Sequence, residues 1–387
     1  MKTTPLLLLL ASSLLLSDEY DFDMGAIESM EPKSYEYNGY LRADDRFQRL
    51  NTKSPLYIQS GDDRSYQNYV YLEGLFEFAY FYEMFTFKTS LMGTYDYVYE
   101  NIAEDNYPVN ELYVDAKITD NHSVLVGKES LKWGKGYYFN PVAFFDRPKD
   151  PQQPTVAREG FTVLKYSYNK SFQGILKNVA FDLLYLRADD KINKDFYRIA
   201  TDSQESNNVG ARLYMLLFDT DIDIIYSYSD AAKEKIGIDF SKNLQTNFEV
   251  HGELAKEIDG YHSYLLGLRY LTDFELTIIS EYVYRSNGLS AEEIESTLVP
   301  IPFIAKNYAI TWVSQKEPFD LLYSSLYFKN MLNLQDHSHQ DKLGATYSFR
   351  NNIEVDLSYN INSGSILSEF GKKSVQDFIW LKTMWLF

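Results

Sequence analysis

The chain has 387 residues, enough for two or three ordinary soluble domains or for one large all-β domain. Its formal net charge of −18 argues against nucleic-acid binding, and the absence of cysteine excludes disulfides, thiolate metal sites, a cysteine nucleophile and a lipoprotein anchor. After residue 17 there is no apolar run of about 18 residues, which excludes membrane-spanning helices.

The N-terminus has the organisation of a secretory signal peptide. Lys2 precedes a short leucine-rich core, and the small residues Ala11 to Ser13 follow. We expect a signal peptide over residues 1–17, with cleavage after Ser13 or Ser17. A short lead over residues 18–33 and a single domain over residues 34–387 complete the predicted organisation.

From residue 34 onward, apolar and polar residues alternate. In the segment 352–361, Ile353, Val355 and Leu357 share one face while Glu354 and Asp356 share the other. A period of two is typical of strands with two different environments. The segments 109–119 and 246–254 show the same pattern.

About eighteen such segments can be read along the chain, although sixteen remains possible because boundaries are uncertain by a few residues. The tight turns are expected near residues 120, 219, 242, 272, 317 and 351. Longer loops alternate with them, at residues 43–66, 131–159, 190–206, 287–305 and 363–376. Short turns at one end and long loops at the other predict a closed antiparallel transmembrane β-barrel with periplasmic turns and long outer loops. An even strand number lets the first strand pair with the last, which removes both sheet edges.

The third long loop, residues 131–159, has an unusual composition. Four prolines restrict its backbone, and Gly134 and Gly136 permit bends beside bulky aromatic residues. Between residues 128 and 159 there are six Lys or Arg and four acidic residues, so this loop is net positive in an acidic chain. We expect it to attract anions, or alternatively to use these charges to bind itself to the wall.

Alternation also predicts which charged side chains line the lumen, where they would set ion preference. These residues are Glu111, Asp115, Lys117, Glu249, His251, Glu253, Lys342, Arg350, Glu354 and Asp356.

Catalytic and metal-binding patterns are weak. The sequence GKG at residues 134–136 lacks the spacing and following Lys-Ser/Thr of a phosphate-binding loop. His337, His339 and Asp341 have ligand-like spacing, but we interpret them as solvated polar residues. A Ser–His hydrolase using His251 or His262 lacks a recognisable serine setting. We expect no enzymatic activity, no cofactor and no metal.

The C-terminus is informative. Phe387, Trp385, Leu381 and Ile379 alternate in a final amphipathic segment that ends on an aromatic residue. Together with the signal peptide, this segment resembles the C-terminal signature of Gram-negative outer-membrane β-barrels. The resemblance implies export to the outer membrane and recognition of Phe387 by the barrel-assembly machinery.

In general porins the third loop folds into the lumen as a constriction, and the resemblance implies that role for residues 131–159. The pattern W-G-x-G, N-P, P-K-D-P and R-x-G is also similar to poorly characterised outer-membrane barrel families. The implied constriction residues are Lys132, Trp133, Lys135, Asn140, Arg147, Lys149, Asp150, Arg158 and Glu159.

A barrel of this size is too wide for its own side chains to fill, so we predict a porin-like channel for passive diffusion of small hydrophilic solutes. Its partners would be outer-membrane lipid, lipopolysaccharide, passing solutes and, in a homo-oligomer, further copies of the chain. The alternative is a structural barrel, or one that exports or assembles surface polysaccharide, with a plugged lumen and function in loops 43–66 and 287–305.

Overall fold

The computed structural model describes residues 33–98, 104–196, 205–298 and 302–387. The predicted signal peptide, and all of the predicted lead except Lys33, lie outside the described residues. No helix in the described part of the chain is long and apolar enough to cross a membrane.

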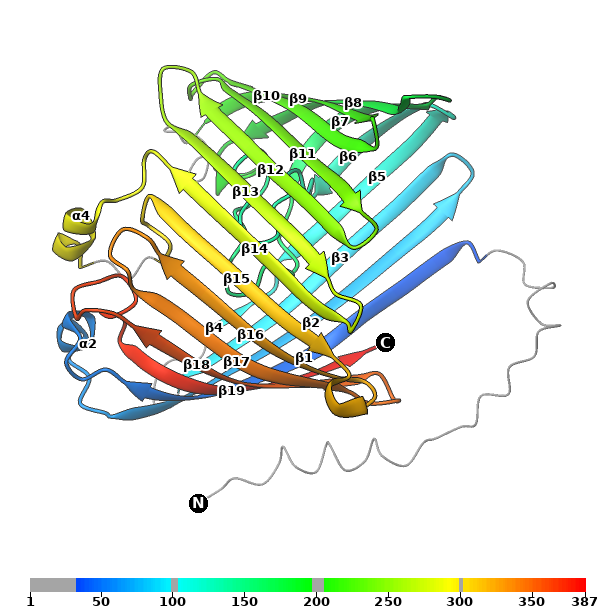
Figure 1. The fold of residues 1–387 in the computed structure, drawn as a ribbon. Helices are drawn as coiled ribbons and strands as arrows, with labels where there is room; N and C mark the ends of the chain where they lie inside the picture. The colour runs from blue at the N-terminus through cyan, green and yellow to red at the C-terminus, as the bar shows by residue number, and fades with distance from the viewer. Residues whose placement is uncertain (1–32, 99–103, 197–204, 299–301) are drawn as a thin grey trace.

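The described residues form one closed antiparallel barrel (Figure 1). Strand β1 pairs with β2 on one side and with β19 on the other, and this closes the barrel. Both pairings keep a regular register over most of β1; for example, Ala43 lies opposite Leu72 of β2 and Thr383 of β19. The short strand β4 pairs with β3 beside β5, so β4 and β5 together occupy one position around the ring. The nineteen described strands therefore occupy eighteen positions, as the alternation predicted.

Most strands have about ten to seventeen residues, which suits a tilted membrane crossing. Their bounds are β1 Tyr35–Leu50, β2 Tyr66–Tyr82, β3 Phe85–Val98, β4 Glu104–Asn106, β5 Val109–Thr119, β6 His122–Glu129, β7 Phe161–Ser171, β8 Leu176–Ala188, β9 Ser206–Leu217, β10 Thr220–Ser229, β11 Lys235–Gln245, β12 Phe248–Glu257, β13 His262–Leu271, β14 Leu276–Arg285, β15 Asn307–Lys316, β16 Ser324–Asn333, β17 His339–Ser348, β18 Ile353–Ser363 and β19 Val375–Leu386.

Several strand boundaries differ from the sequence prediction. The turn expected near residue 242 lies at residues 246–247 instead, between the end of β11 and the start of β12. Strand β1 continues to Leu50 instead of ending at residue 43, because Arg42, Asp44 and Arg46 keep the inward side of the alternation although they are charged. Strand β16 begins at Ser324 instead of residue 318, because Pro318 starts a short 3-10 turn, Pro318–Asp320. Proline has no backbone N–H for a strand pairing, so it favours the turn.

The two ends of the barrel differ. Helix α2, Pro55–Ser60, and helix α4, Ala291–Ser296, both lie at the end with the long loops, whereas Phe387 lies toward the end with the short turns (Figure 1). We call these the long-loop end and the short-turn end.

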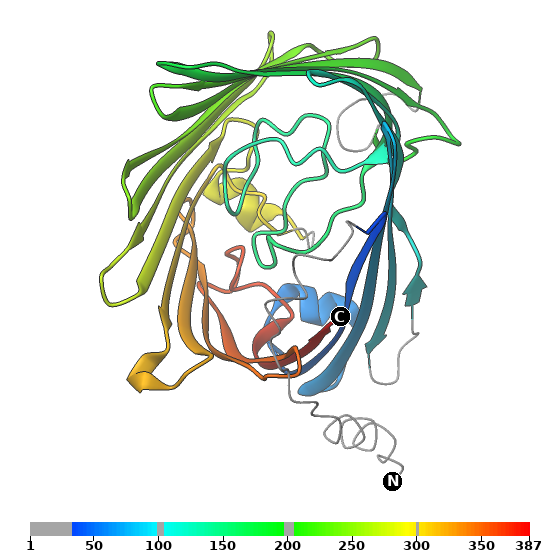
Figure 2. The same ribbon diagram turned by 90° about the vertical axis from the view of Figure 1, so that its right-hand side faces the viewer.

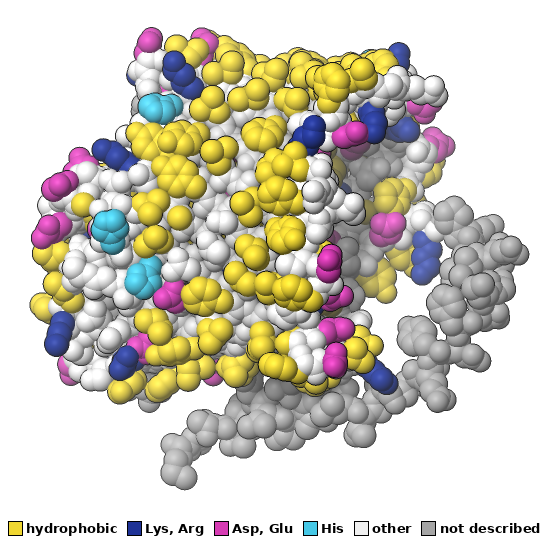
Figure 3. All heavy atoms as spheres, viewed as in Figure 1, with side chains coloured by type: hydrophobic (Ala, Val, Ile, Leu, Met, Phe, Trp, Pro, Cys, Tyr) yellow, Lys and Arg dark blue, Asp and Glu magenta, His cyan; other side chains and the backbone are white. Residues whose placement is uncertain are grey.

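Apolar side chains are abundant on the face of the barrel shown in Figure 3. On β17, Leu343 is 62% exposed on the outside, while its neighbour Lys342 points inward and is half-buried. On β12, Leu254 is outward and exposed, while Glu253 is buried inside. This alternation places apolar side chains where lipid would lie and charged ones in the interior.

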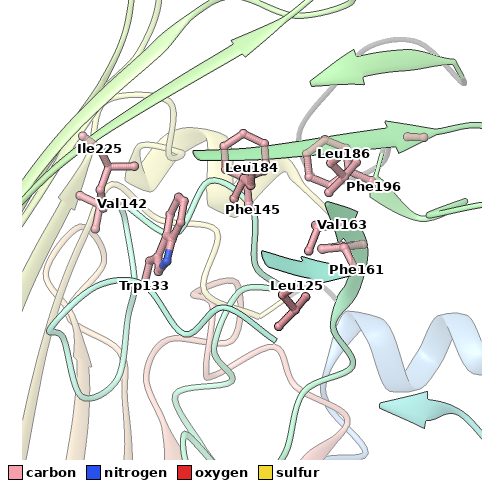
Figure 4. Packing of buried hydrophobic residues seen from close by; sticks show 12 residues of the cluster. Leu125, Trp133, Val142, Phe145, Phe161, Val163, Leu184, Leu186, Phe196 and Ile225 are labelled. Atoms are coloured by element: carbon pink, nitrogen blue, oxygen red, sulfur yellow. The ribbon is translucent and has the colours of Figure 1, made fainter. Parts of the chain in front are cut away.

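The connection between β6 and β7, residues 130–160, lies inside the ring of strands (Figure 2). We call it the inner loop. Its apolar side chains pack on inward-facing residues of the wall, so the barrel has a packed hydrophobic cluster within its lumen (Figure 4). Trp133 is only 3% exposed and packs edge-on against Phe145, with ring centroids 5.9 Å apart. The other members of this cluster are Leu125, Val142, Phe161, Val163, Leu184, Leu186, Ala188, Phe196, Ile225 and Ala255.

Candidate constriction inside the barrel

Glu253 of β12 accepts three backbone hydrogen bonds from the inner loop. The N–H groups of Lys135 and Gly136 donate to its Oε1, each at 2.7 Å, and the N–H of Val142 donates to Oε2 at 3.1 Å. Gly134 adopts a φ of +99°, and a Cβ added there would lie 2.8 Å from Glu253 Oε1. The two glycines of the GKG segment thus let the backbone wrap around a buried carboxylate.

Glu281 of β14 makes the adjacent attachment. It accepts hydrogen bonds from the N–H groups of Tyr137 and Tyr138, the latter at 2.9 Å to Oε2. His251 Nε2 lies 2.9 Å from Glu281 Oε1, and the Tyr137 hydroxyl donates to Glu249 Oε2 at 3.1 Å. Hydrogen bonds to an ionised carboxylate are among the stronger ones in proteins, so this part of the loop is held firmly.

These carboxylates belong to an acidic sector of the interior, which we call the acidic wall: Asp223 of β10, Asp239 of β11, Glu249 and Glu253 of β12, and Glu281 of β14. Lys135 extends from the inner loop toward it, with Nζ 2.8 Å from Asp223 and 3.9 Å from Asp239. The inner loop therefore covers the acidic wall with both a cation and backbone N–H groups.

Charged side chains of the inner loop mainly bind one another. Arg158 pairs with Asp146 at 2.9 Å, and Arg147 pairs with Glu159 at 3.0 Å. Burial raises the pKa of Asp146, and the guanidinium of Arg158 opposes that rise. Lys149 donates to the carbonyl of Gly136, and burial lowers its pKa. These contacts match the expected alternative in which the loop charges bind the loop to itself and to the wall.

The remaining predicted loop residues have local roles. Asn140 Oδ1 accepts a hydrogen bond from the Lys149 N–H at 3.0 Å, and Asp150 Oδ1 accepts one from the Gln152 N–H at 2.9 Å, so both stabilise turns. Lys132 has a left-handed backbone, with φ of +55°, directly before Trp133.

A second sector of the interior is cationic, and we call it the cationic wall: Arg46 of β1, Lys329 of β16, Lys342 of β17 and Lys382 of β19. Three of these surround the ring of Trp380. The Arg46 guanidinium carbon and Lys382 Nζ each lie 4.0 Å from its centroid, and Lys342 Nζ lies at 4.5 Å. Aromatic faces attract cations, which helps to hold like charges together.

Two carboxylates lie near the cationic wall. Asp44 is within 3.7 Å of Arg46, but it also pairs with Arg42 at 3.2 Å. Asp356 accepts a hydrogen bond from Tyr327 at 2.8 Å and lies opposite Lys382 in the strand register. Four cations against two acids leave this sector net positive. Arg46, Lys342 and Lys382 remain partly accessible inside the barrel.

Among the residues that the structure describes, the inner loop contacts the cationic wall through Lys329. Lys329 Nζ donates to the backbone carbonyls of Pro151 and Gln152, the latter at 3.3 Å, and lies 4.8 Å from the Tyr138 ring centroid. Among the described residues, the hydrogen bonds and ion pairs of the loop otherwise lie within the loop or toward β5 to β14.

The structure distributes the predicted lumen residues widely. Glu111 pairs with Lys88 at 2.8 Å, and Lys117 lies at the short-turn end, 3.6 Å from Asp120. Asp115 is half-buried on β5, and Glu354 accepts a hydrogen bond from Ser348 near the short-turn end. Arg350 was assigned to a lumen-facing strand position, which is wrong: β17 ends at Ser348, and Arg350 lies exposed in the following turn.

Alternation identified Lys342 and Asp356 but missed the other cations of this sector. Arg46 lay beyond the predicted end of β1, and Lys329 lay within a predicted strand but was not assigned to the lumen. The convergence of Lys382 and its neighbours on Trp380 depends on register between strands, which one sequence does not display.

The loops at the long-loop end bind one another. Glu369, between β18 and β19, accepts hydrogen bonds from the Phe303 N–H, the Tyr308 hydroxyl at 2.6 Å and Asn333 Nδ2 at 2.7 Å. Burial raises the pKa of Glu369. Lys372 donates to the carbonyls of Ile294 and Thr297 at the end of α4. We call these connected loops at the long-loop end the cap. Loops 43–66 and 287–305, which the sequence indicated as alternative functional sites, form part of the cap or lie beside it.

Comparison with known proteins was made at three levels. No protein family matches the sequence, and no curated protein matches it either. Solved structures do match. OccK2 (OpdF) of Pseudomonas aeruginosa has a TM-score of 0.57 at 8% identity, with 91% of this chain and 97% of that chain covered. A BenF-like porin of Pseudomonas fluorescens Pf-5 has a TM-score of 0.56 at 10% identity, with 92% and 98% covered. The outer membrane protein OpdK of Pseudomonas aeruginosa has a TM-score of 0.53 at 8% identity, with 91% and 98% covered.

These likenesses define the class of fold: a closed barrel of eighteen strands, as in outer-membrane porins. The predicted fold class is therefore confirmed. At these identities the likeness concerns the fold alone, and the residues of the interior must carry the functional argument.

Proposed function

We propose that this chain is a porin-like channel of the outer membrane of a Gram-negative bacterium, through which small hydrophilic solutes diffuse past the inner loop. One observation carries the proposal: residues 130–160 lie within a closed barrel and are fastened to one sector of its wall, at Glu253 and Glu281. A barrel of this strand number encloses more space than its wall side chains can fill. The fold shared with outer-membrane porins supports the same function.

The passage would run between the inner loop and the cationic wall. Solutes would meet Arg46, Lys342 and Lys382, whereas the acidic wall is covered by the loop. Charges that line a narrow passage set which ions enter it. The channel should therefore prefer anions, although the whole chain carries a net charge of −18.

The proposed orientation places the short turns in the periplasm and the long loops outside, beside lipopolysaccharide. The apolar exterior suits the lipid band of an outer membrane. Recognition of Phe387 by the assembly machinery, export by the signal peptide and association of several copies remain predictions from the sequence.

A plugged structural or polysaccharide-assembly barrel is the second candidate. The observation in its favour is the cap that Glu369 and Lys372 tie together at the long-loop end, together with the hydrophobic packing of the inner loop. In this reading the surface of the cap would carry the function, and solutes would not cross the barrel.

Conductance in planar bilayers separates the two candidates. We expect purified, refolded protein to give stable open steps, with a reversal potential displaced toward anions in a salt gradient. A barrel that is folded by circular dichroism but gives no open steps would exclude the channel.

A further inference from the structure

The acidic wall presents a problem for an anion-preferring passage. Five carboxylates, Asp223, Asp239, Glu249, Glu253 and Glu281, gather on β10, β11, β12 and β14, and all five are inward-facing. Exposed to the lumen, they would attract cations. Asp223, Asp239, Glu253 and Glu281 are instead at most 3% exposed.

Two of these carboxylates are occupied by the inner loop backbone. Glu253 accepts three N–H groups and Glu281 accepts two, and each of the five donors belongs to residues 135–142. A backbone N–H brings partial positive charge without a mobile side chain. The GKG segment permits this close approach of the backbone to Glu253, because side chains at Gly134 or Gly136 would collide with Glu253 or with the loop and Leu265.

We propose that Glu253 and Glu281 are the positioning residues of the passage: they hold the inner loop against the acidic wall, and the loop thereby shields that wall from solutes. This inference rests on the proposed channel function for its effect on selectivity, but the attachment itself does not. Glu253 was predicted to line the lumen and set ion preference directly; in this proposal it acts through the loop instead.

Shielding is accompanied by charge neutralisation at the same place. Lys135 Nζ lies 2.8 Å from Asp223 and 3.9 Å from Asp239, and Lys149 donates to the Gly136 carbonyl beside Glu253. His251 stands between Glu249 and Glu281, with its ring 5.1 Å from that of Tyr137. Moving the loop away would take Lys135 and the five backbone N–H groups from the acids and leave only wall partners, such as His251 of β12 and Arg212 of β9, which lies 3.7 Å from Asp223. The passage would therefore gain a cation-attracting surface.

The glycines provide a test that leaves every charge in place. The substitution Gly134→Ala puts a Cβ 2.8 Å from Glu253 Oε1 and should displace the loop. Gly174→Ala is the matched control, because Gly174 also has a positive φ, +116°, but has no atom within 4 Å of the added Cβ. Both variants carry a similar backbone strain, and only one disturbs the attachment.

The position of the loop can be measured without any conduction. The chain has no cysteine, so nitroxide labels can be placed at Thr155→Cys on the loop and Asp120→Cys in a short turn. Pulsed electron paramagnetic resonance then measures the distance between these two labels. We expect a narrow distance distribution in the parent and with Gly174→Ala, and a broad or shifted one with Gly134→Ala. Glu253→Gln, which keeps the side-chain shape, should broaden it too and serves as the second variant if Gly134→Ala does not fold.

Selectivity is the second readout. With Gly134→Ala the cation-to-anion permeability ratio should rise by roughly threefold or more, because acids become accessible to the passage. A disulfide between Val142→Cys and Gly237→Cys should restore the parent ratio, and reduction should abolish the rescue. An added Cβ at Gly237 would lie 3.1 Å from the Val142 Cβ, so the loop and β11 must separate slightly to reach the usual disulfide Cβ–Cβ distance of about 3.8 Å. A defect of folding alone would not be repaired by this tether.

The outcomes separate the two proposals. An unchanged distance distribution with both Gly134→Ala and Glu253→Gln would overturn the positioning role. A displaced loop with unchanged selectivity would overturn the shielding role. If no variant conducts, including the parent, the channel function fails and shielding of a passage fails with it, while the distances still decide whether the two carboxylates hold the loop.

Discussion

The acidic wall and the cationic wall are two sectors of one barrel interior, yet the protein treats them differently. Lys135 and five backbone N–H groups cover the acids of β10 to β14. Three cations of the cationic wall, Arg46, Lys342 and Lys382, gather instead around Trp380 and remain partly accessible. In the proposed channel, the sign of the passage would therefore depend less on the total charge than on which charges the inner loop leaves uncovered.

The largest expected effect comes from removing the cationic wall. In the triple variant Arg46→Gln, Lys342→Gln, Lys382→Gln, the anion preference should be lost, with a change of about tenfold or more in the permeability ratio. One unit charge at 4 Å contributes ~1 kcal/mol in bulk water and ~4 kcal/mol at an effective dielectric constant of 20. Reversal potentials in a salt gradient measure the ratio.

Lys177→Gln is the matched control for that variant, because Lys177 pairs with Asp219 outside the passage, where both side chains are well exposed. Equal shifts in the triple variant and the control would mean that surface charge, and not the cationic wall, sets the preference.

Packing of the inner loop gives the next largest effect. Trp133 is almost fully buried between the loop and the wall, so Trp133→Ala should destabilise the barrel by about 3–5 kcal/mol through cavity formation. Urea unfolding followed by tryptophan and tyrosine fluorescence measures it. Phe319→Ala is the control: this residue is 95% exposed, and we expect a change within about 0.5 kcal/mol. Similar losses for both would show that the loop is not packed as described.

The cap at the long-loop end should give a smaller effect. Glu369→Gln weakens an acceptor shared by Phe303, Tyr308 and Asn333, at a cost of about 1–3 kcal/mol. Limited proteolysis should cut the loops of residues 286–306 and 364–374 faster, while selectivity stays the same. The exposed neighbour Glu295→Gln should leave both unchanged. A change in selectivity with Glu369→Gln would place the cap in the passage and contradict its purely structural role.

The sequence predicted the architecture well because alternation is local. Pairs such as Ile353 and Glu354 assign their two faces without knowledge of any partner strand. The errors occurred where local signals conflict. Charged inward residues made β1 seem to end before Leu50, and the 3-10 turn that begins at Pro318 makes β16 start later than predicted.

The candidate site was less predictable, because its meaning depends on contacts between distant segments. Glu253 has the alternation of a lumen residue, but its partners are backbone groups more than a hundred positions away in the chain. The surplus of Lys and Arg in the inner loop suggested an anion-attracting element, whereas Lys135, Arg147 and Arg158 each have an acidic partner. Composition counts these charges but does not show which of them are neutralised.

The most direct test is the single-channel recording of the unmodified protein in a potassium chloride gradient. The account predicts discrete open steps with a reversal potential on the chloride side. Open steps with a preference for potassium would contradict the claim that the inner loop covers the acidic wall and leaves the cationic wall accessible to the passage.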